Sequence, residues 1–191
     1  LIGPDTKAIL PVHVYGIPCD VAAIKDIADR HGLPVIYDAA HAFGVRLRGE
    51  SVLVHGDLSM LSFHATKVFT TAEGGALATG NPELHQRARV LKNFGITGEE
   101  SVVAPGLNGK MNEMQAALGL AQLDGLDANT EKRRRLDGIY RRLLQHEPGL
   151  ALLDMPRDVD PNYAYFPVRV QEALFGLNRD TLYETLKAFN I

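Results

Sequence analysis

Short apolar runs alternate with amphipathic segments along the first part of the chain. The run Ala8–Val14 predicts a strand, and residues 21–28 carry apolar side chains at helical spacing. Asp20 before this segment is a good helix N-cap and Gly32 after it a good helix terminator. Leu33–Tyr37 is a second apolar run, of strand length. A strand–helix–strand unit of this kind predicts a parallel sheet with a right-handed crossover, and therefore an α/β fold.

The pattern continues to the end of the chain. We expect a short excursion over residues 45–56 that turns at Gly49, then strands at Leu58–Leu61 and Gly74–Thr79. Helices are predicted for residues 82–94, for 111–126, and from a cap at Asn129 or Thr130 to about residue 146, with a loop over 95–109. Past Gly149, a strand within residues 163–170 and a helix over 179–189 indicate a second, smaller unit. We divide the chain into residues 1–128, part of a large domain, and residues 129–191, a connecting helix and the start of a small C-terminal domain.

Composition narrows the class of protein. The 191 residues are 46 % hydrophobic and carry a net charge of −3 without a long basic run, so nothing points to nucleic acid or to a membrane surface. No apolar stretch has membrane-spanning length and no signal peptide is visible. The single cysteine, Cys19, excludes an internal disulfide and fits a reducing compartment, so we expect a cytoplasmic enzyme or binding domain. Because the sequence opens at Leu1 directly before a predicted strand, we expect a fragment of a longer polypeptide.

The main candidate for chemistry is Lys67, in the segment Ser62-Phe-His-Ala-Thr-Lys67 that follows a buried strand. A lysine among small and hydroxylated residues at a strand end is expected to be partly desolvated. Burial lowers a lysine pKa and frees the amine as a nucleophile. Such lysines form Schiff bases with carbonyl compounds, pyridoxal phosphate above all. The alternative is an ordinary solvated surface lysine.

Two further candidates follow the strand that ends near residue 37. Ligands collect at the carboxyl ends of parallel strands, which is where Asp38 and His41 stand. Asp38 could pair with a pyridinium nitrogen and keep it protonated, or it could be only a helix cap or turn residue. His41 could bind the phenolic oxygen of the cofactor or lie against its ring, or it could be a loop histidine without a role.

The remaining candidates suit an anion. Ser62 and His64 alternate along the strand end, so both could reach a phosphate group, although a serine here could simply satisfy a local backbone group. Asn108, in a glycine-rich loop before a long helix, reads by itself as a capping or turn residue. Phosphate-binding and dinucleotide-binding glycine loops, a nucleophile elbow and a zinc-binding His-Glu-x-x-His pair are all absent from the sequence.

Four blocks of the sequence resemble the DegT/DnrJ/StrS nucleotide-sugar aminotransferases. They are residues 11–16 (PVHVYG), 35–42 (VIYDAAHA), 62–67 with 73–75 (SFHATK, EGG) and 108–119 (NGKMNEMQAALG), and their order and spacing match across residues 1–140. The resemblance implies the aspartate-aminotransferase-like fold of pyridoxal phosphate enzymes (fold type I), a mostly parallel sheet flanked by helices with a small α+β C-terminal domain.

The resemblance also implies roles. Lys67 would carry the cofactor and move the proton between cofactor and substrate carbons, while Asp38 would pair with the pyridinium nitrogen. His41 stands where many members have Gln, at the ring oxygen, and Ser62 and His64 would hold the phosphate. Asn108 would reach the phosphate of a neighbouring subunit's cofactor, so the site would require a homodimer.

The reaction implied is transamination of a nucleotide-linked keto sugar, with L-glutamate as the usual donor. Residues 66–69, 92–95 and 103–113 look most like enzymes that act on TDP-4-keto-6-deoxy-glucose at C4, in amino-sugar and O-antigen biosynthesis. Amination of the 3-keto isomer and a non-catalytic sensor on the same fold are the alternatives. Because the family's N-terminal segment and most of its C-terminal domain are absent from this sequence, these expectations concern the intact enzyme.

Overall fold

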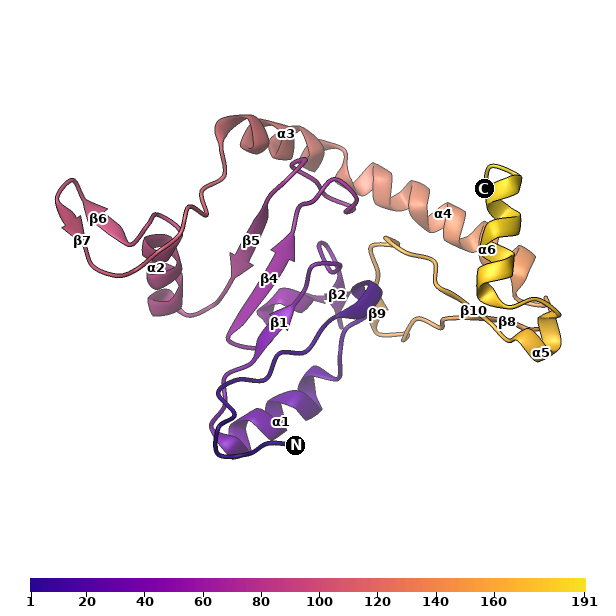
Figure 1. The fold of residues 1–191 in the computed structure, drawn as a ribbon, viewed down its shortest axis with the longest axis horizontal. Helices are drawn as coiled ribbons and strands as arrows, with labels where there is room; N and C mark the ends of the chain where they lie inside the picture. The colour runs from indigo at the N-terminus through magenta and orange to yellow at the C-terminus, as the bar shows by residue number, and fades with distance from the viewer.

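A three-stranded sheet forms the centre of the computed structural model, which describes residues 1–191 (Figure 1). Its strands are β1 (Ile36–Asp38), β4 (Leu58–Ser62) and β5 (Gly75–Ala78), in the order β1-β4-β5. β4 runs parallel to β1, and β5 runs antiparallel to β4. The α/β class predicted from the sequence is confirmed, with β5 as an antiparallel member of the sheet.

The first helix, α1 (Val21–His31), has the boundaries that its capping residues predicted. The Asp20 carboxylate accepts a hydrogen bond from the Ala23 amide at 3.0 Å, and Gly32 ends the helix with a left-handed φ of 61°. Ala28 on the inner face of α1 is buried in one cluster with Val35 and Tyr37, which places the helix against β1.

The strand predicted at residues 8–14 is wrong as a continuous element. The segment lies parallel to β1 but makes only two isolated bridges, Ile9 to Val35 and Val12 to Asp38. Pro11 between them has no amide hydrogen to donate, which prevents a regular ladder. The chain then forms a short 3-10 turn, η1 (Val14–Gly16), beside the carboxyl end of β1.

The predicted excursion after β1 is a small hairpin with its turn at Gly49 (φ 81°). Its strands are β2 (Arg46–Leu47) and β3 (Glu50–Ser51), followed by the 3-10 turn η2 (Val52–Val54). β2 also pairs antiparallel with β9 (Val159–Asp160), so the C-terminal part of the chain returns to the segment that follows β1.

The loop predicted over residues 95–109 is partly wrong. After α2 (Pro82–Leu91), which Asn81 caps, the chain forms an antiparallel hairpin of β6 (Ile96–Gly98) and β7 (Ser101–Val102). Both strands are short and exposed on both faces, so they lack the apolar alternation by which a strand is recognised. We call residues 82–110 the arm; in Figure 1 it extends to one side of the central sheet.

Two helices follow, and the predicted cap of the second is wrong. α3 (Glu113–Asp124) opens with a capping box between Asn112 and Gln115. α4 (Leu126–Leu144) begins directly after Gly125, without a side-chain cap. The Thr130 hydroxyl instead donates to the Leu126 carbonyl at 3.0 Å inside the helix, so neither Asn129 nor Thr130 starts it.

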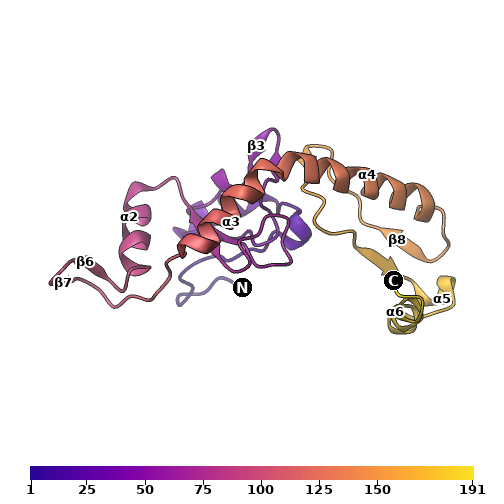
Figure 2. The ribbon, with the colours of Figure 1, turned by 90° about the horizontal axis from the view of Figure 1, so that it is seen from above.

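The chain ends in a small unit of two strands and two helices. β8 (Leu150–Leu152) pairs antiparallel with β10 (Val168–Val170), and α5 (Glu172–Phe175) and α6 (Arg179–Ala188) follow. Figure 2 shows this unit at the opposite end of the molecule from the arm, with α3 and α4 running between them. The domain division at residues 128 and 129 stays a prediction; in the structure it falls within α4.

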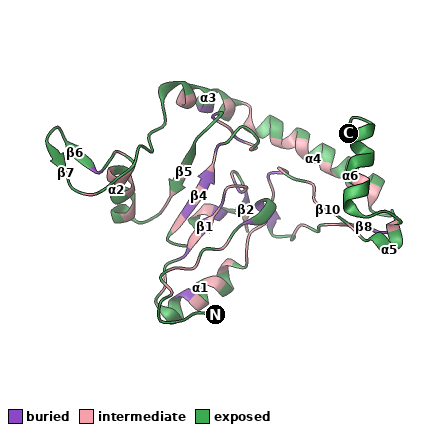
Figure 3. Ribbon diagram, viewed as in Figure 1, coloured by how far each residue is buried: buried purple, intermediate pink, exposed green.

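Buried residues are concentrated in the middle of the molecule (Figure 3). Only 19 of the 191 residues are buried, and the largest cluster joins residues after β1 and β4 with Val159 of β9. Phe43, Phe63 and Phe69 pack ring against ring in this cluster, with centroids 4.4 to 5.7 Å apart. None of the helices combines the length and the apolar character that crossing a membrane requires.

Candidate active site

The carboxyl ends of β1 and β4 meet at one edge of the sheet. Asp38 is in register with Met60, and the Ala39 amide donates to the Met60 carbonyl at 2.8 Å. The chain therefore leaves both strands side by side, with residues 39–43 on one side and 63–71 on the other. This edge is where an open parallel sheet binds its ligand.

Asp38 lies half-buried at the end of β1. Its Oδ1 accepts a hydrogen bond from the Ala40 amide at 3.0 Å, which closes a tight turn after the strand. This is the turn role that the sequence offered as an alternative. This hydrogen bond uses only one carboxylate oxygen. The other oxygen can therefore accept a hydrogen bond from a protonated ligand nitrogen.

Lys67 lies at the end of a turn held from both sides by buried phenylalanines. The Lys67 amide donates to the His64 carbonyl at 2.9 Å, and the Thr71 amide donates to the Phe63 carbonyl at 3.0 Å. Phe63 and Phe69, before and after the lysine, are buried in the aromatic cluster. The turn is therefore fixed by packing, and the Lys67 side chain is half-buried in a small cavity shared with His41.

His41 is the residue that the structure places against Lys67. Its Nδ1 accepts a hydrogen bond from the Tyr15 amide at 3.2 Å, and its ring lies 4.6 Å from that of Tyr165. Burial lowers the pKa of His41, and the nearby Lys67 charge lowers it further, against an opposing effect of Asp38. His41 is thus close enough to interact electrostatically with both Lys67 and Asp38, the two charged residues predicted to bind the cofactor.

Ser62 and His64 stay close to each other, but His64 is turned to local partners. The Ser62 hydroxyl accepts from the His64 amide at 3.4 Å, the local role considered for this serine. The His64 Nδ1 lies 3.0 Å from the Thr66 hydroxyl, and its Nε2 lies 3.6 Å from the Glu73 carboxylate. Both side chains that the sequence assigned to a phosphate therefore have local partners in the structure.

Asn108 lies apart from these residues, exposed on the arm. It bridges to Asn93 just after α2, and the neighbouring Leu107 carbonyl accepts from the Phe94 amide at 3.0 Å. The structure therefore brings together Asp38, His41, Ser62, His64 and Lys67 at one sheet edge and leaves Asn108 elsewhere.

Two residues at the site were not predicted from the sequence: Asn162 and Tyr165, which line the small cavity with Lys67 and His41. They come from the C-terminal segment, more than 90 residues beyond Lys67 along the chain. The run of aromatic residues from 163 to 166 was visible in the sequence and is the one signal that could have marked this segment.

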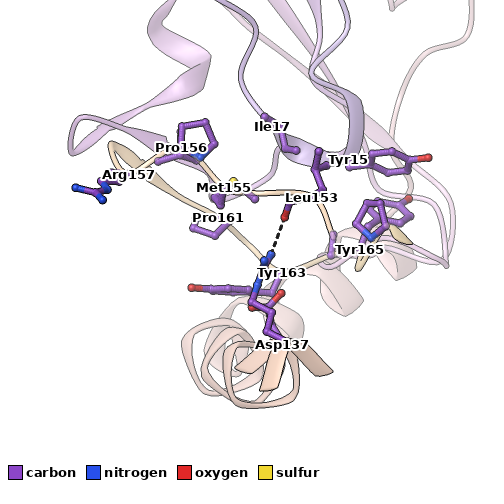
Figure 4. Close-up of a pocket in the computed structure, with 14 residues that line it drawn as sticks. Tyr15, Ile17, Asp137, Leu153, Met155, Pro156, Arg157, Pro161, Tyr163 and Tyr165 are labelled. Atoms are coloured by element: carbon purple, nitrogen blue, oxygen red, sulfur yellow. Dashed lines mark hydrogen bonds and ion pairs between the residues drawn. The ribbon is translucent and has the colours of Figure 1, made fainter. Parts of the chain in front are cut away.

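A second cavity, of about 290 Å³, adjoins this segment (Figure 4). Tyr15 and Tyr165 lie between it and His41, with ring centroids 5.6 Å apart. On its other side Arg141 of α4 donates to the Leu153 carbonyl at 3.0 Å and to the Asp137 carboxylate at 2.9 Å. The long helix is thereby tied to the start of the segment that also carries Asn162 and Tyr165.

The residues at the sheet edge fit pyridoxal phosphate. They offer an amine for the aldehyde, a carboxylate with a free oxygen for the ring nitrogen, an imidazole and a hydroxyl. The lysine is held by a packed turn and not on a mobile tail. No group of three or more His, Cys, Asp and Glu side chains is arranged to hold a metal ion.

Comparison with known proteins identifies the family. The DegT/DnrJ/EryC1/StrS aminotransferase family model matches residues 1–191. The chain belongs to this family. The aminotransferases of the family are pyridoxal phosphate enzymes, so the predicted cofactor is confirmed for the family.

Curated relatives and solved structures agree with this placement. The chain is 49 % identical over 190 residues to a dTDP-4-amino-4,6-dideoxy-D-glucose transaminase of Shigella dysenteriae, covering 100 % of this chain and 52 % of the relative. A transaminase of the same name from Escherichia coli is 44 % identical over 191 residues, with 100 % and 51 % covered. The structure of DesI in the presence of its TDP-sugar product matches with a TM-score of 0.92 and 39 % identity, over 98 % of this chain and 48 % of that one. The chain spans about half the length of the curated relatives it matches, and the fold predicted from the sequence is confirmed.

Proposed function

We propose that the enzyme to which this chain belongs is a pyridoxal phosphate-dependent aminotransferase that converts TDP-4-keto-6-deoxy-glucose to its 4-amino sugar. L-glutamate is the proposed amino donor, and it leaves as the corresponding keto acid. The observation that carries the proposal is the pairing of Lys67 with His41 in one cavity at the sheet edge, next to Asp38. The transaminase names of the curated relatives support the choice of sugar.

Each residue of the group has a task in this reaction. When bound, pyridoxal phosphate supplies an electron sink that makes a C–H bond next to nitrogen acidic. The Lys67 Nζ would take that proton from the donor carbon and deliver it to the cofactor carbon, and would move a proton the opposite way when the sugar is aminated. Asp38 would keep the ring nitrogen protonated, His41 would bind the ring oxygen, and Ser62 with His64 would hold the phosphate.

Three further parts of the proposal concern the assembled enzyme. We propose a homodimer in which Asn108 of each chain reaches the cofactor phosphate of the other, because the exposed position of Asn108 leaves it free to serve a site other than its own. We also propose that the enzyme acts in the cytoplasm, where nucleotide sugars are made. The amino sugar is proposed to enter lipopolysaccharide O-antigen synthesis.

The test uses the whole enzyme, loaded with pyridoxal phosphate and supplied with L-glutamate and TDP-4-keto-6-deoxy-glucose. NMR of the product is expected to show an amine at C4 of the sugar. Amination of the 3-keto isomer alone would move the substrate to that sugar and leave the reaction class intact. A protein that takes up no cofactor and develops no visible absorbance would favour the sensor alternative and overturn the proposal.

A further inference from the structure

Asn162 is the most extensively bonded side chain between the C-terminal segment and the sheet edge. It is 4 % exposed. Its amide nitrogen donates to the His41 carbonyl and to the Phe43 carbonyl, both at 2.9 Å, across more than a hundred residues of sequence. Its Oδ1 accepts from the Ala164 amide at 3.1 Å. One side chain thus joins the loop after β1 to the segment that carries Tyr165.

The η1 turn closes on the same loop from the other side. Gly16 has a φ of 80° and lies so near the loop that a Cβ there would meet the His41 carbonyl oxygen at 2.7 Å. Beside it, Tyr15 has a φ of 57°, an uncommon conformation for a residue with a side chain. This geometry aims the Tyr15 amide at the His41 Nδ1.

The amide fixes the state of the imidazole. A backbone N–H can only donate, so the Nδ1 that accepts from it must carry a lone pair, and a neutral ring then has its proton on Nε2. An imidazolium has no lone pair at Nδ1 and would lose this hydrogen bond. The Nε2 has no hydrogen-bond partner within the chain and is not among its buried, unsatisfied atoms, so it is open to a ligand.

We propose that Asn162 is a positioning residue: with the Tyr15 amide, it holds the Asp38–Phe43 loop so that His41 stays a neutral imidazole that presents its Nε2–H to the Lys67 cavity. His41 then serves as a fixed hydrogen-bond donor and takes no part in proton transfer, which is left to Lys67. The C-terminal segment is in this way part of the site before any substrate binds. The effect of Asn162 on amino transfer rests on the proposed function. The protonation of His41 and the position of its loop can be tested without it.

The first test is hydrogen exchange of the whole enzyme without substrate, followed by mass spectrometry. Asn162→Ala is expected to speed exchange of the amides of residues 39–45 by about 10-fold or more, because the loop loses both side-chain bonds to its carbonyls. Exchange in α1 is expected to stay unchanged. Asn129→Ala, at an exposed position on α4, is the matched control and should alter neither region.

The second test observes the ring itself. With ¹⁵N-labelled histidine, the signal that disappears in His41→Gln identifies His41, and its shifts should report a proton on Nε2 at pH 7. In Asn162→Ala this signal should move toward the average of the two neutral forms. If the loop is displaced by 1 Å, kcat/KM for the amino transfer should fall by about 100-fold.

Three results would overturn the proposal. They are unchanged exchange of residues 39–45 in Asn162→Ala, a rise of equal size in α1 and the loop, and a His41 proton found on Nδ1. None of them depends on which sugar the enzyme aminates. An enzyme that fails the sugar assay but gives the expected exchange and NMR results would lose the proposed function and keep this positioning role.

Discussion

The Lys67 turn and the arm differ in whether their side chains find partners within the chain. Phe63 and Phe69, on either side of Lys67, are buried, and their rings pack against each other. On the arm, α2 has no buried residue, and Val102 and Leu107 are 70 % and 63 % exposed. The lysine is therefore positioned by its own chain, whereas Asn108 is presented on a surface that the chain does not cover. The proposed role of Lys67 can therefore be tested in one chain, whereas the proposed role of Asn108 requires the proposed homodimer.

The substitution with the largest expected effect is Lys67→Ala. In the proposed mechanism Lys67 both carries the cofactor and moves the proton, so the rate of amino transfer should fall by about 10⁴-fold or more. The buried phenylalanines remain, so the melting temperature should change little. Turnover measured by NMR and thermal unfolding followed by circular dichroism give the two readouts. Lys132→Ala, at an exposed position on α4, is the control and should leave both unchanged; an active Lys67→Ala would refute the catalytic role.

Packing in the two regions can be compared by truncating one side chain in each. Phe69→Ala should cost about 3–5 kcal/mol of unfolding free energy, because it empties a buried aromatic site. Val102→Ala, at an exposed hairpin position, should change that free energy by no more than about 0.5 kcal/mol. Urea unfolding measures both. A loss of more than about 1 kcal/mol of unfolding free energy in Val102→Ala would mean that the hairpin is covered in the assembled enzyme. The difference in packing between the two regions would then exist only in the isolated chain.

Acid should distinguish a buried histidine, His13, from an exposed one on the arm. Burial, with a smaller effect of His55, lowers the pKa of His13 from 6.5 to about 4. Between these values the unfolded chain binds the proton before the folded chain does, so stability rises with pH. The contribution is complete above about pH 6.5 and is lost as the pH falls toward 4, with a total of about 3 kcal/mol. Urea unfolding at pH 7 and 4.5 should show this loss in the parent enzyme and a smaller one in His13→Gln.

The matched control is His85→Gln on the exposed arm. It should keep the full acid dependence of the parent. If His13→Gln loses as much stability on acidification as the parent does, another group is responsible for the slope.

Helix ends that are set by interactions between neighbouring residues could be predicted from the sequence. Asp20 and Gly32 marked both ends of α1, because a cap and a left-handed terminator act within a few residues. The cap at Asn129 or Thr130 failed for a related reason. Both are good capping residues, but α4 begins just after α3 at Gly125, and the Thr130 hydroxyl is used inside the helix.

Long-range contacts account for most of what was missed. Nothing near Asn162 in the sequence shows that its amide binds carbonyls of the loop after β1. The hairpin of β6 and β7 was missed because exposed strands carry no burial pattern. Asp38, His41 and Lys67 were found because they follow strands whose carboxyl ends must share an edge. Their individual roles stay predictions.

The smallest expected effect, from Asn108→Ala, bears most directly on the comparison. If Asn108 binds the phosphate of a neighbouring chain's cofactor, its loss removes one hydrogen bond to a charged group and should slow amino transfer by about 10-fold. Lys67→Ala and Asn108→Ala would then damage different components of one shared site. Co-expression of the two variants should produce mixed dimers in which one of the two sites holds both native residues, so activity should exceed the mean of the separately purified variants. Activity equal to that mean would indicate that Asn108 and Lys67 of one chain act in the same site. The exposure of the arm would then need another explanation.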